Sequence, residues 1–206
     1  MIKKIFLSFF GFLLFNIFLG DVNANQSEEP IEIYADDGIE WHKNEKKYIA
    51  IGNAKATQGT LSLKSDLIEA FYEENRNSEM DIIKVQAHKN VLVTDDKVEI
   101  TGGNSAEFNV VKDYFKITGK KLQLTSEQDK LNANKKIEYW RSKNIAVATG
   151  KAIAIKKDEF VIKGDKLVWH IEKKGEKMNI KKILGFENVS IETNNEVAFS
   201  DKALYN

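Results

Sequence analysis

The side chains of this chain that could do acid–base or metal chemistry are three histidines and a set of paired carboxylates. His42, His88 and His170 lie far apart and have none of the short spacings that bring two ligands to one metal ion. The carboxylate pairs fall in expected turns and linkers: Glu28-Glu29, Asp36-Asp37, Glu73-Glu74 and Asp95-Asp96. Hydrolysis of a sugar needs two carboxyl groups that converge on one cleft, and no spacing here predicts that. Because a glycine-rich phosphate loop and a nucleophile elbow are also missing, we expect no enzyme, no metal ion and no other cofactor.

The composition removes further classes of function. The chain has no cysteine, which excludes disulfides, thiolate nucleophiles and cysteine-ligated metals. Its 31 basic residues balance its 31 acidic residues, and only Arg76 and Arg141 are arginines. Proteins that read nucleic acid usually carry an excess of positive charge and arginine side chains for the base edges. We therefore expect no nucleic-acid partner.

The N-terminus has the pattern of an export signal. Two lysines precede an apolar run of about fifteen residues over 5–19, which is shorter than the roughly 20 residues of a membrane-spanning helix. The residues around Ala24 suit a signal peptidase, so cleavage is predicted after Ala24. This assigns 1–24 to a signal peptide and 25–206 to the exported domain. The alternative is an uncleaved membrane anchor, in which 1–24 stays in the mature protein.

The elements that must position any site are strands. Apolar and polar residues alternate with a period of two in nearly every segment, as in 31–35 and 160–171, which is typical of half-buried strands. The stretch 66–74 keeps the same period and is predicted as strand. Clusters of Asn, Asp, Gly and Lys separate the runs. The domain is therefore predicted to be all-β and built from antiparallel strands.

A repeat of about 98 residues divides this domain into two units, about 33–108 and 131–206. The small residues of 50–56 return at that offset in 148–154. With an offset longer by one, Val98 and Ile100 return as Val197 and Phe199, and the longer offset also relates 63–66 to 162–165. The chain is therefore predicted to stack one multi-strand unit on a second, with no helix between them.

A shorter motif recurs within each unit: an apolar residue, any residue, a small residue and then Asp. It occurs at 33–36, 63–66, 162–165 and 198–201. We interpret these sites as strand corners, where the small residue permits a bend and Asp accepts hydrogen bonds from turn amides. Strands that bend at regular intervals predict a wide sandwich or roll whose sheet wraps an interior.

Small residues line one face of 48–57 and of its copy in the second unit. Such a line indicates either close backbone packing or room for a ligand, and both interpretations remain open at this stage. If acyl chains filled the interior, each buried methylene would contribute about 0.8 kcal/mol, so about a dozen carbons would gain on the order of 10 kcal/mol. On this hypothesis, Ala54→Leu and Ala152→Leu weaken lipid binding without unfolding the protein. Larger inward side chains such as Phe115 limit the space to a groove.

Several of these segments together resemble one known family. The stretch Pro30–Asp36 is similar to the opening strand of OstA-type domains, and Phe115–Gly119 resembles a strand ending of that family. Between them, further segments continue the likeness in order: Ile39-Glu40-Trp41, Tyr48–Ala54, Gln58-Gly59 and Ser65-Asp66. Over about 30–206 the chain therefore resembles LptA/OstA-like periplasmic lipopolysaccharide-transport proteins.

The resemblance implies an open, twisted β-jellyroll that shields lipid A acyl chains in a hydrophobic groove on the way from the inner to the outer membrane. The periplasm is the implied location. Implied partners are lipopolysaccharide, further copies of the chain joined head to tail through edge strands, an inner-membrane ABC-transporter complex and an outer-membrane translocon. The candidate lipid-binding side chains on the interior face are Ile33, Ala54, Ala56, Leu63, Ile68, Phe108, Ile117, Ala152, Ile162, Leu167 and Trp169.

Two other functions fit the same pattern. One is the inner-membrane-anchored subunit of the same export pathway, which keeps its N-terminal helix in the bilayer. The other is a structural β-repeat protein with a filled interior and no lipid cargo. The second unit ends at 203–206, before any copy of 115–119. Whether that end is natural, and in which direction copies would stack, stays open.

Overall fold

The chain forms one antiparallel β-sheet that is wound into an open roll. The computed structural model describes residues 29–76, 78–95, 98–126, 129–174 and 177–206. The predicted signal peptide lies outside these ranges. Among the described residues, strands account for nearly all regular structure, so the all-β prediction is confirmed, including strand structure over 66–74. No helix in this part of the chain has the length and apolar character needed to span a bilayer.

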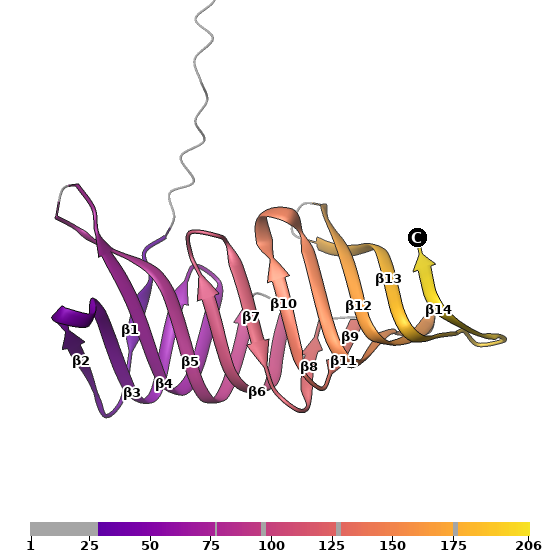
Figure 1. The fold of residues 1–206 in the computed structure, drawn as a ribbon, viewed down its shortest axis with the longest axis horizontal. Coiled ribbons are helices and arrows are strands. Elements are labelled where there is room, and N and C mark those ends of the chain that lie inside the picture. The colour runs from indigo at the N-terminus through magenta and orange to yellow at the C-terminus, as the bar shows by residue number, and fades with distance from the viewer. Residues whose placement is uncertain (1–28, 77, 96–97, 127–128, 175–176) are drawn as a thin grey trace, which may run out of the picture.

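Within the described residues, fourteen strands and two single-turn 3-10 helices follow one another. The strands are β1 (Glu32–Tyr34), β2 (Gly38–His42), β3 (Lys47–Gln58), β4 (Leu61–Glu74), β5 (Met80–Asp95), β6 (Val98–Asn109), β7 (Tyr114–Thr118), β8 (Leu122–Thr125), β9 (Asp129–Ala133), β10 (Lys136–Trp140), β11 (Ile145–Lys156), β12 (Phe160–Lys174), β13 (Lys177–Glu192) and β14 (Val197–Tyr205). The 3-10 helices are η1 (Lys43–Glu45) and η2 (Arg141–Lys143). Figure 1 shows the strands stacked along the long axis, from β2 and β3 at one end to β14 at the other.

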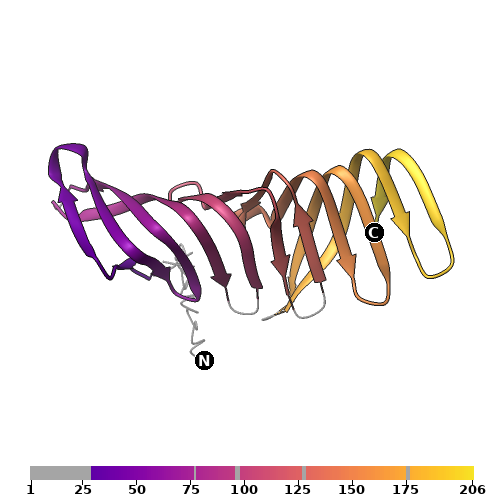
Figure 2. The same ribbon diagram turned by 90° about the horizontal axis from the view of Figure 1, so that it is seen from below.

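The long strands bend at β-bulges, and this folds the sheet into two facing halves. In β3 the pairing with β4 shifts between Ile51 and Ala54, where Gly52 and Asn53 adopt φ values of 77° and 43°. Before this bulge β3 pairs with β2, and after it β3 pairs with β1. Further positive-φ pairs lie in β5, β11 and β13: Lys89 and Asn90, Gly150 and Lys151, Glu187 and Asn188. Each long strand therefore crosses from the half that contains β2, β7 and β10 to the half that contains β1, β8 and β9 (Figures 1 and 2).

Hydrogen bonds between Asn and Asp side chains hold the corners. Asn90 donates from Nδ2 to both carboxylate oxygens of Asp66 at 3.0 Å. Asn188 donates to Asp165 at 2.7 Å, and Asn53 to Asp36 at 2.8 Å. The motif is thus a strand corner at these three positions. Its Asp, however, accepts from the Asn of a neighbouring strand, where the sequence predicted acceptance from turn amides.

The second half of the chain repeats the element order of the first. Each 3-10 helix is followed by a left-handed residue, Lys46 with φ 51° and Asn144 with φ 51°. The carbonyl of Lys46 accepts from the amide of Tyr72 at 3.0 Å, and that of Asn144 accepts from the amide of Ile171 at 2.9 Å. These matching hydrogen bonds make η1–β3–β4 the counterpart of η2–β11–β12, residue by residue.

The pairing corrects one sequence match at the C-terminal strand. Ile100 lies opposite Val93, and in the second half Ala198 lies opposite Ile191. The counterpart of Ile100 is therefore Ala198, and the match to Phe199 was wrong by one residue. A shift of one residue moves a strand side chain to the other face, and Phe199 is 80% exposed.

Candidate functional site

A continuous row of side chains follows one half of the sheet from end to end. Each member lies directly opposite the next in the strand pairing. The row is Trp41, Tyr48, Ala70, Val85, Phe108, Phe115, Tyr139, Ala146, Trp169, Ile183 and Tyr205. We call this half of the sheet the aromatic wall. Directly opposed side chains on one face are near neighbours, so the wall presents an unbroken apolar surface to the interior.

The facing half carries an equivalent row of aliphatic side chains. Its members are Ile33, Ala56, Leu63, Val93, Ile100, Leu124, Leu131, Ala154, Ile162, Ile191 and Ala198. We call this half the aliphatic wall. Buried members of both rows belong to one hydrophobic core. The interior is therefore an apolar core between two walls that extends along the roll.

All eleven predicted interior residues face this space. Ten of them are buried: Ala54, Ala56, Leu63, Ile68, Phe108, Ile117, Ala152, Ile162, Leu167 and Trp169. Ile33 is half-buried and packs against the core. Only some of them border open space, because several lie near the fold line between the walls, where the two halves meet.

The line of small residues packs closely at this fold line. Ala54 lies opposite Ser65 and Ala152 opposite Gly164, and both alanines are 0% exposed. A Cβ atom added to Gly185 would come within 2.9 Å of Val189. Ala54 and Ala152 border neither of the two interior cavities. For Ala54 and Ala152 these contacts support close backbone packing, whereas Ala56, on the same line, borders an interior cavity.

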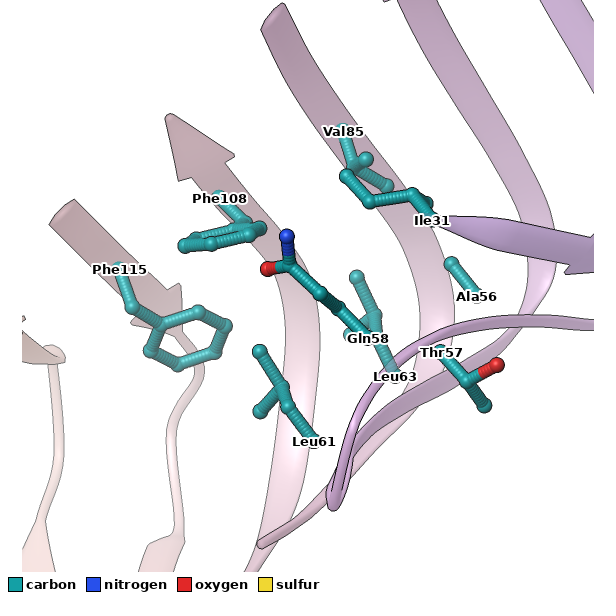
Figure 3. A pocket seen from close by; sticks show the side chains of 9 residues that line it. All are labelled: Ile31, Ala56, Thr57, Gln58, Leu61, Leu63, Val85, Phe108 and Phe115. Atoms are coloured by element: carbon teal, nitrogen blue, oxygen red, sulfur yellow. The ribbon is translucent and has the colours of Figure 1, made fainter. Parts of the chain in front are cut away.

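A small cavity lies between the walls in the first unit. Its volume is about 20 Å³, and it is lined by Ile31, Ala56, Thr57, Gln58, Leu61, Leu63, Val85, Phe108 and Phe115. Figure 3 shows these side chains, with Phe108 and Phe115 on the strands of one wall and Gln58 and Leu61 at the turn that joins β3 to β4. A space of this size has room for about one water-sized probe, so the first unit is nearly filled by its own side chains.

A larger cavity lies where the two units meet, and we call it the junction cavity. Its volume is about 140 Å³, close to that of an engineered apolar cavity of about 150 Å³ that binds benzene. It is lined by Leu61, Val93, Asp95, Val98, Ile100, Phe115, Leu124, Ser126, Asp129, Ile137, Tyr139, Arg141, Ala146, Trp169, Ile171 and Ile180. Leu61 and Phe115 border both cavities. The two spaces are therefore neighbours in one groove.

Of the residues that line the junction cavity, sequence reasoning named Trp169 as a candidate for lipid binding and Phe115 as a large inward side chain. The lining residues come from ten strands, β4 to β13, and two of these, β8 and β9, are only four and five residues long. The signal that was available is the repeat itself: Ala146 stands at the counterpart of the large Tyr48. Where one unit has a large side chain and the other has a small one, the two units leave different amounts of space between the walls.

Polar groups lie among the apolar lining of the junction cavity. Partial burial raises the pKa of the Asp129 carboxyl, while nearby Lys156 opposes that rise. Asp129 Oδ1 and Trp169 Nε1 are both buried without a hydrogen-bond partner among the described residues. Arg141 lies with its guanidinium carbon 6.0 Å from the Phe108 ring and its Nε 3.5 Å from Asp113 Oδ1. The cavity is thus apolar with a few polar groups, which is the usual chemistry of a small-molecule site.

None of the three histidines lines either interior cavity. His42 contacts Glu40 at 2.7 Å, and His88 contacts Glu69 at 3.2 Å. Across the described ranges, no group of three His, Asp or Glu side chains could hold a metal ion. His42 and His88 therefore contact carboxylates away from both cavities.

Both ends of the sheet expose apolar side chains. At the N-terminal end Trp41 and Ile39 of β2 are exposed, and at the C-terminal end Val197, Phe199 and Leu204 of β14 are exposed. Within the described chain, β14 pairs only with β13. An edge strand with free backbone groups and exposed apolar side chains can add a strand from another chain.

The chain is similar to a known family and to solved structures. A family model described as "LptA/(LptD N-terminal domain) LPS transport protein" matches residues 32–174, which is more than half of the chain. Among solved structures, the chain is similar to LptH, the LptA-homologous periplasmic component of the conserved lipopolysaccharide transport device from Pseudomonas aeruginosa. The identity is 15% over 84% of this chain and 94% of that chain, with a TM-score of 0.31. No curated protein matches.

Proposed function

The chain belongs to the family of LptA and LptD N-terminal-domain lipopolysaccharide transport proteins, and from this we propose that it carries lipopolysaccharide through the periplasm with the acyl chains of lipid A shielded inside the roll. Members of this family serve transport, and no catalytic step enters the proposal. The chain would accept its cargo on the inner-membrane side and deliver it toward the outer membrane.

The observation that carries the proposal is the unbroken apolar interior. The aromatic and aliphatic walls face each other from β2 to β14. Acyl chains inside such a groove lose contact with water, at about 0.8 kcal/mol for each buried methylene. The junction cavity holds about 140 Å³, which is small for a whole acyl chain. Loading therefore requires the walls to separate, and an open roll can do so without breaking a closed ring of strand pairs.

The exposed sheet ends support a bridging role. We propose that β14 of one copy pairs with the N-terminal edge of another, so that the apolar interiors become continuous. The same ends would pair with the inner-membrane transporter complex and with the outer-membrane translocon. Exposed Trp41 at one end and Phe199 at the other provide apolar contacts for such pairing.

Location follows the family. We propose a periplasmic protein whose signal peptide is removed after Ala24. The alternative is the inner-membrane-anchored subunit of the same pathway. N-terminal sequencing of the mature protein separates the two, because a start at Asn25 supports the carrier and an intact 1–24 segment supports the anchored subunit.

Native mass spectrometry tests the carrier function against the structural β-repeat. The protein would be purified with and without added lipopolysaccharide, and alkali-deacylated lipopolysaccharide would serve as the control. The carrier predicts a bound mass for the intact lipid, little binding of the deacylated form, and a ladder of oligomers. A lipid-free monomer that ignores intact lipopolysaccharide would contradict the proposal and favour the structural protein.

A further inference from the structure

The outer face of the second unit carries a row of aliphatic side chains. Four of them lie directly opposite one another across β11 to β14: Val147, Val168, Leu184 and Leu204. Each alternates with a residue of the aromatic wall and therefore points away from the interior. None of the four belongs to the hydrophobic core or to the side chains that pack against it, and Leu204 is 51% exposed. We call these four residues the outer row.

Further apolar side chains extend this row on the same face. Trp140 lies opposite both Tyr114 and Ile145, and the ring centroids of Tyr114 and Trp140 are 5.1 Å apart. Ile145 and Phe186 each lie two residues from a member of the row on the same strand, so both point outward. All four of these side chains are half-buried. Together with the outer row they form what we call the outer patch.

The first unit is polar at most of the positions that correspond to the outer row. Ile171 is the counterpart of Tyr72, because the amides of both make the matching hydrogen bond to the left-handed residue after a 3-10 helix. Counting back three residues and then following the strand pairing gives the other counterparts. The residues that correspond to Val168, Leu184 and Leu204 are Glu69, Gln86 and Glu107. Since the same sheet folds with polar side chains at these positions, the fold does not require the apolar row.

Only Val147 keeps an apolar counterpart within the outer row. This is Ile49, which lies between Glu40 and Glu69 in the strand pairing. At the positions of Trp140 and Ile145, the first unit has His42 and Lys47. The outer patch is therefore a property of the second unit.

Lysines flank the outer row. On one side the directly opposed residues are Thr149, Lys166, Phe186 and Lys202, and on the other they are Ile145, His170 and Lys182. Lys166 Nζ lies 5.7 Å from the centre of the Phe186 ring. All three side chains with a permanent charge among these seven are positive.

Two carboxylates stand at the margins of the patch. Glu138 lies opposite Val147 and ends the row at β10. Its carboxylate contacts Lys136 Nζ at 2.8 Å and accepts a hydrogen bond of 2.8 Å from the Tyr114 hydroxyl. Glu172 lies two residues beyond His170. Neither interrupts the apolar surface between β11 and β14.

An apolar surface edged by lysines suits an anionic bilayer. Contiguous exposed apolar side chains mark a surface for a membrane or for a protein partner. Tryptophan and tyrosine favour the level of the lipid head groups, and lysine can bury its methylenes beside apolar side chains while its ammonium meets a lipid phosphate. A second copy docked through the same face would set these lysines against one another, which like-charge repulsion opposes.

We propose that the outer patch docks the second unit onto the surface of a bilayer that contains anionic phospholipids. Its aromatic and aliphatic side chains reach the head-group region, and Lys166, Lys182 and Lys202 contact phosphates. The inference goes beyond the proposed carrier function, because it concerns the outside of the roll and does not depend on what the interior holds.

Flotation with vesicles tests the docking surface. The purified exported protein would be mixed at about 0.1 M salt with vesicles of phosphatidylethanolamine and phosphatidylglycerol, and separately with vesicles of phosphatidylcholine. Neither preparation contains lipopolysaccharide, so failure of the carrier function would leave this result unaffected. We expect the protein to float with the anionic vesicles and to remain unbound with the neutral ones. A protein that ignores the anionic vesicles would overturn the proposal.

The test variant gives the second unit the side chains of the first. Leu184→Gln with Leu204→Glu introduces the counterparts Gln86 and Glu107, which hydrogen-bond to each other at 3.2 Å in the same sheet. The double variant is therefore expected to fold, with a thermal midpoint close to that of the parent. It should lower partitioning onto the anionic vesicles about tenfold, because two leucines no longer leave water. If it fails to fold, Leu204→Glu alone replaces it and should lower partitioning several-fold.

The matched control is Ile49→Gln with Leu67→Glu. It makes the same two kinds of change at half-buried, outward positions of the first unit, and its partitioning should stay within twofold of the parent. Equal losses in the test variant and the control would overturn the patch, since the added negative charge alone would then explain them. A folded test variant that partitions like the parent would overturn it as well.

The lysines have their own readout. Lys166→Gln with Lys202→Gln should lower partitioning onto the anionic vesicles at least fivefold, and this difference should shrink as salt is raised. Unchanged partitioning would overturn the contact between these lysines and phosphates.

Sedimentation without lipid tests the competing occupant, a second copy of the chain. If Leu184→Gln with Leu204→Glu separates oligomers of the protein but leaves its partitioning onto vesicles unchanged, the face is a contact between copies and the membrane proposal is wrong.

Discussion

Phe160 and Tyr205 meet across the interior with their ring centroids 4.4 Å apart and their planes at 51°. Phe160 begins β12 on the aliphatic wall, and Tyr205 ends the row of the aromatic wall. Their contact joins the two walls at the C-terminal end of the roll. In the first unit the corresponding end is bordered by Leu61 and Phe108, which line the small cavity.

Removing one ring should open this end of the roll. Phe160 is buried, so Phe160→Ala is expected to lower the free energy of unfolding by about 3–5 kcal/mol, as is typical of large-to-small core changes. Urea denaturation measures the loss, and Phe160→Leu should lose less because it retains most of the apolar volume. A loss below about 1 kcal/mol for Phe160→Ala would show that the walls are not joined there.

The fold line should reject larger side chains. Ala152 is fully buried opposite Gly164, and overpacking such a site typically costs about 1–3 kcal/mol. Ala152→Leu is therefore expected to destabilise the protein, which differs from the sequence-based hypothesis that it only weakens lipid binding. Thermal unfolding of Ala152→Leu and Ala152→Ser separates the two: the Ser variant should lose much less. An unchanged midpoint for the Leu variant would restore the view of Ala152 as a residue facing free space.

The corner residue Asn90 should matter through both its backbone and its side chain. It adopts φ 48° and donates to both oxygens of Asp66. Asn90→Ala removes the hydrogen bonds to Asp66. It also leaves a residue with no polar side chain in the left-handed conformation, which costs about 1–2 kcal/mol of stability. Asn90→Gly loses only the side chain, so chemical denaturation should show it to be the more stable variant. Equal losses in both would assign the whole effect to the hydrogen bonds.

Acid stability should depend in part on Glu69. Lys47 donates to this carboxyl at 3.0 Å and lowers its pKa, against an opposing effect of partial burial. Since the pKa is lower in the folded state, Glu69 stabilises the fold above the unfolded value of about 4.3, and this contribution is lost as the pH falls through the folded pKa.

Glu69→Gln should therefore flatten the dependence of stability on pH below about pH 4.5. Denaturation midpoints of both proteins at about pH 7 and about pH 3.5 measure the effect, and the difference between them should be smaller at the lower pH. A constant difference would mean that the ion pair does not contribute. The effect should also shrink in high salt, because the pair is partly exposed.

Sequence patterns predicted the strands and the interior face because period two is set by backbone geometry and burial alone. Ile68, Ile162 and Leu167 were assigned to the interior on that basis, and all three are buried. The spacing of about 98 residues between matching segments is also the spacing of the two 3-10 turns.

The same patterns could not predict the cavities, because a cavity depends on which residues from distant strands face one another. Ala54 packs at a fold line whereas Ala146 borders open space, although both are alanines on the inner face of a strand, and only the match of Ala146 to Tyr48 in the repeat distinguishes them in the sequence. The bulges decide the difference. A one-residue shift at a bulge, as between Ile100 and Gly103 in β6, changes which side chains meet.

The most direct test of lipid passage through the interior is site-specific photocrosslinking in cells. A benzoylphenylalanine would replace Leu124, which lines the junction cavity, or its neighbour Gln123, which is exposed and, by the alternation of the strand, faces outward. After irradiation, adducts would be detected with an antibody against lipopolysaccharide. Passage between the walls predicts a strong adduct at position 124 and little at position 123. Equal adducts at both positions, or an adduct at position 123 alone, would contradict transport inside the roll.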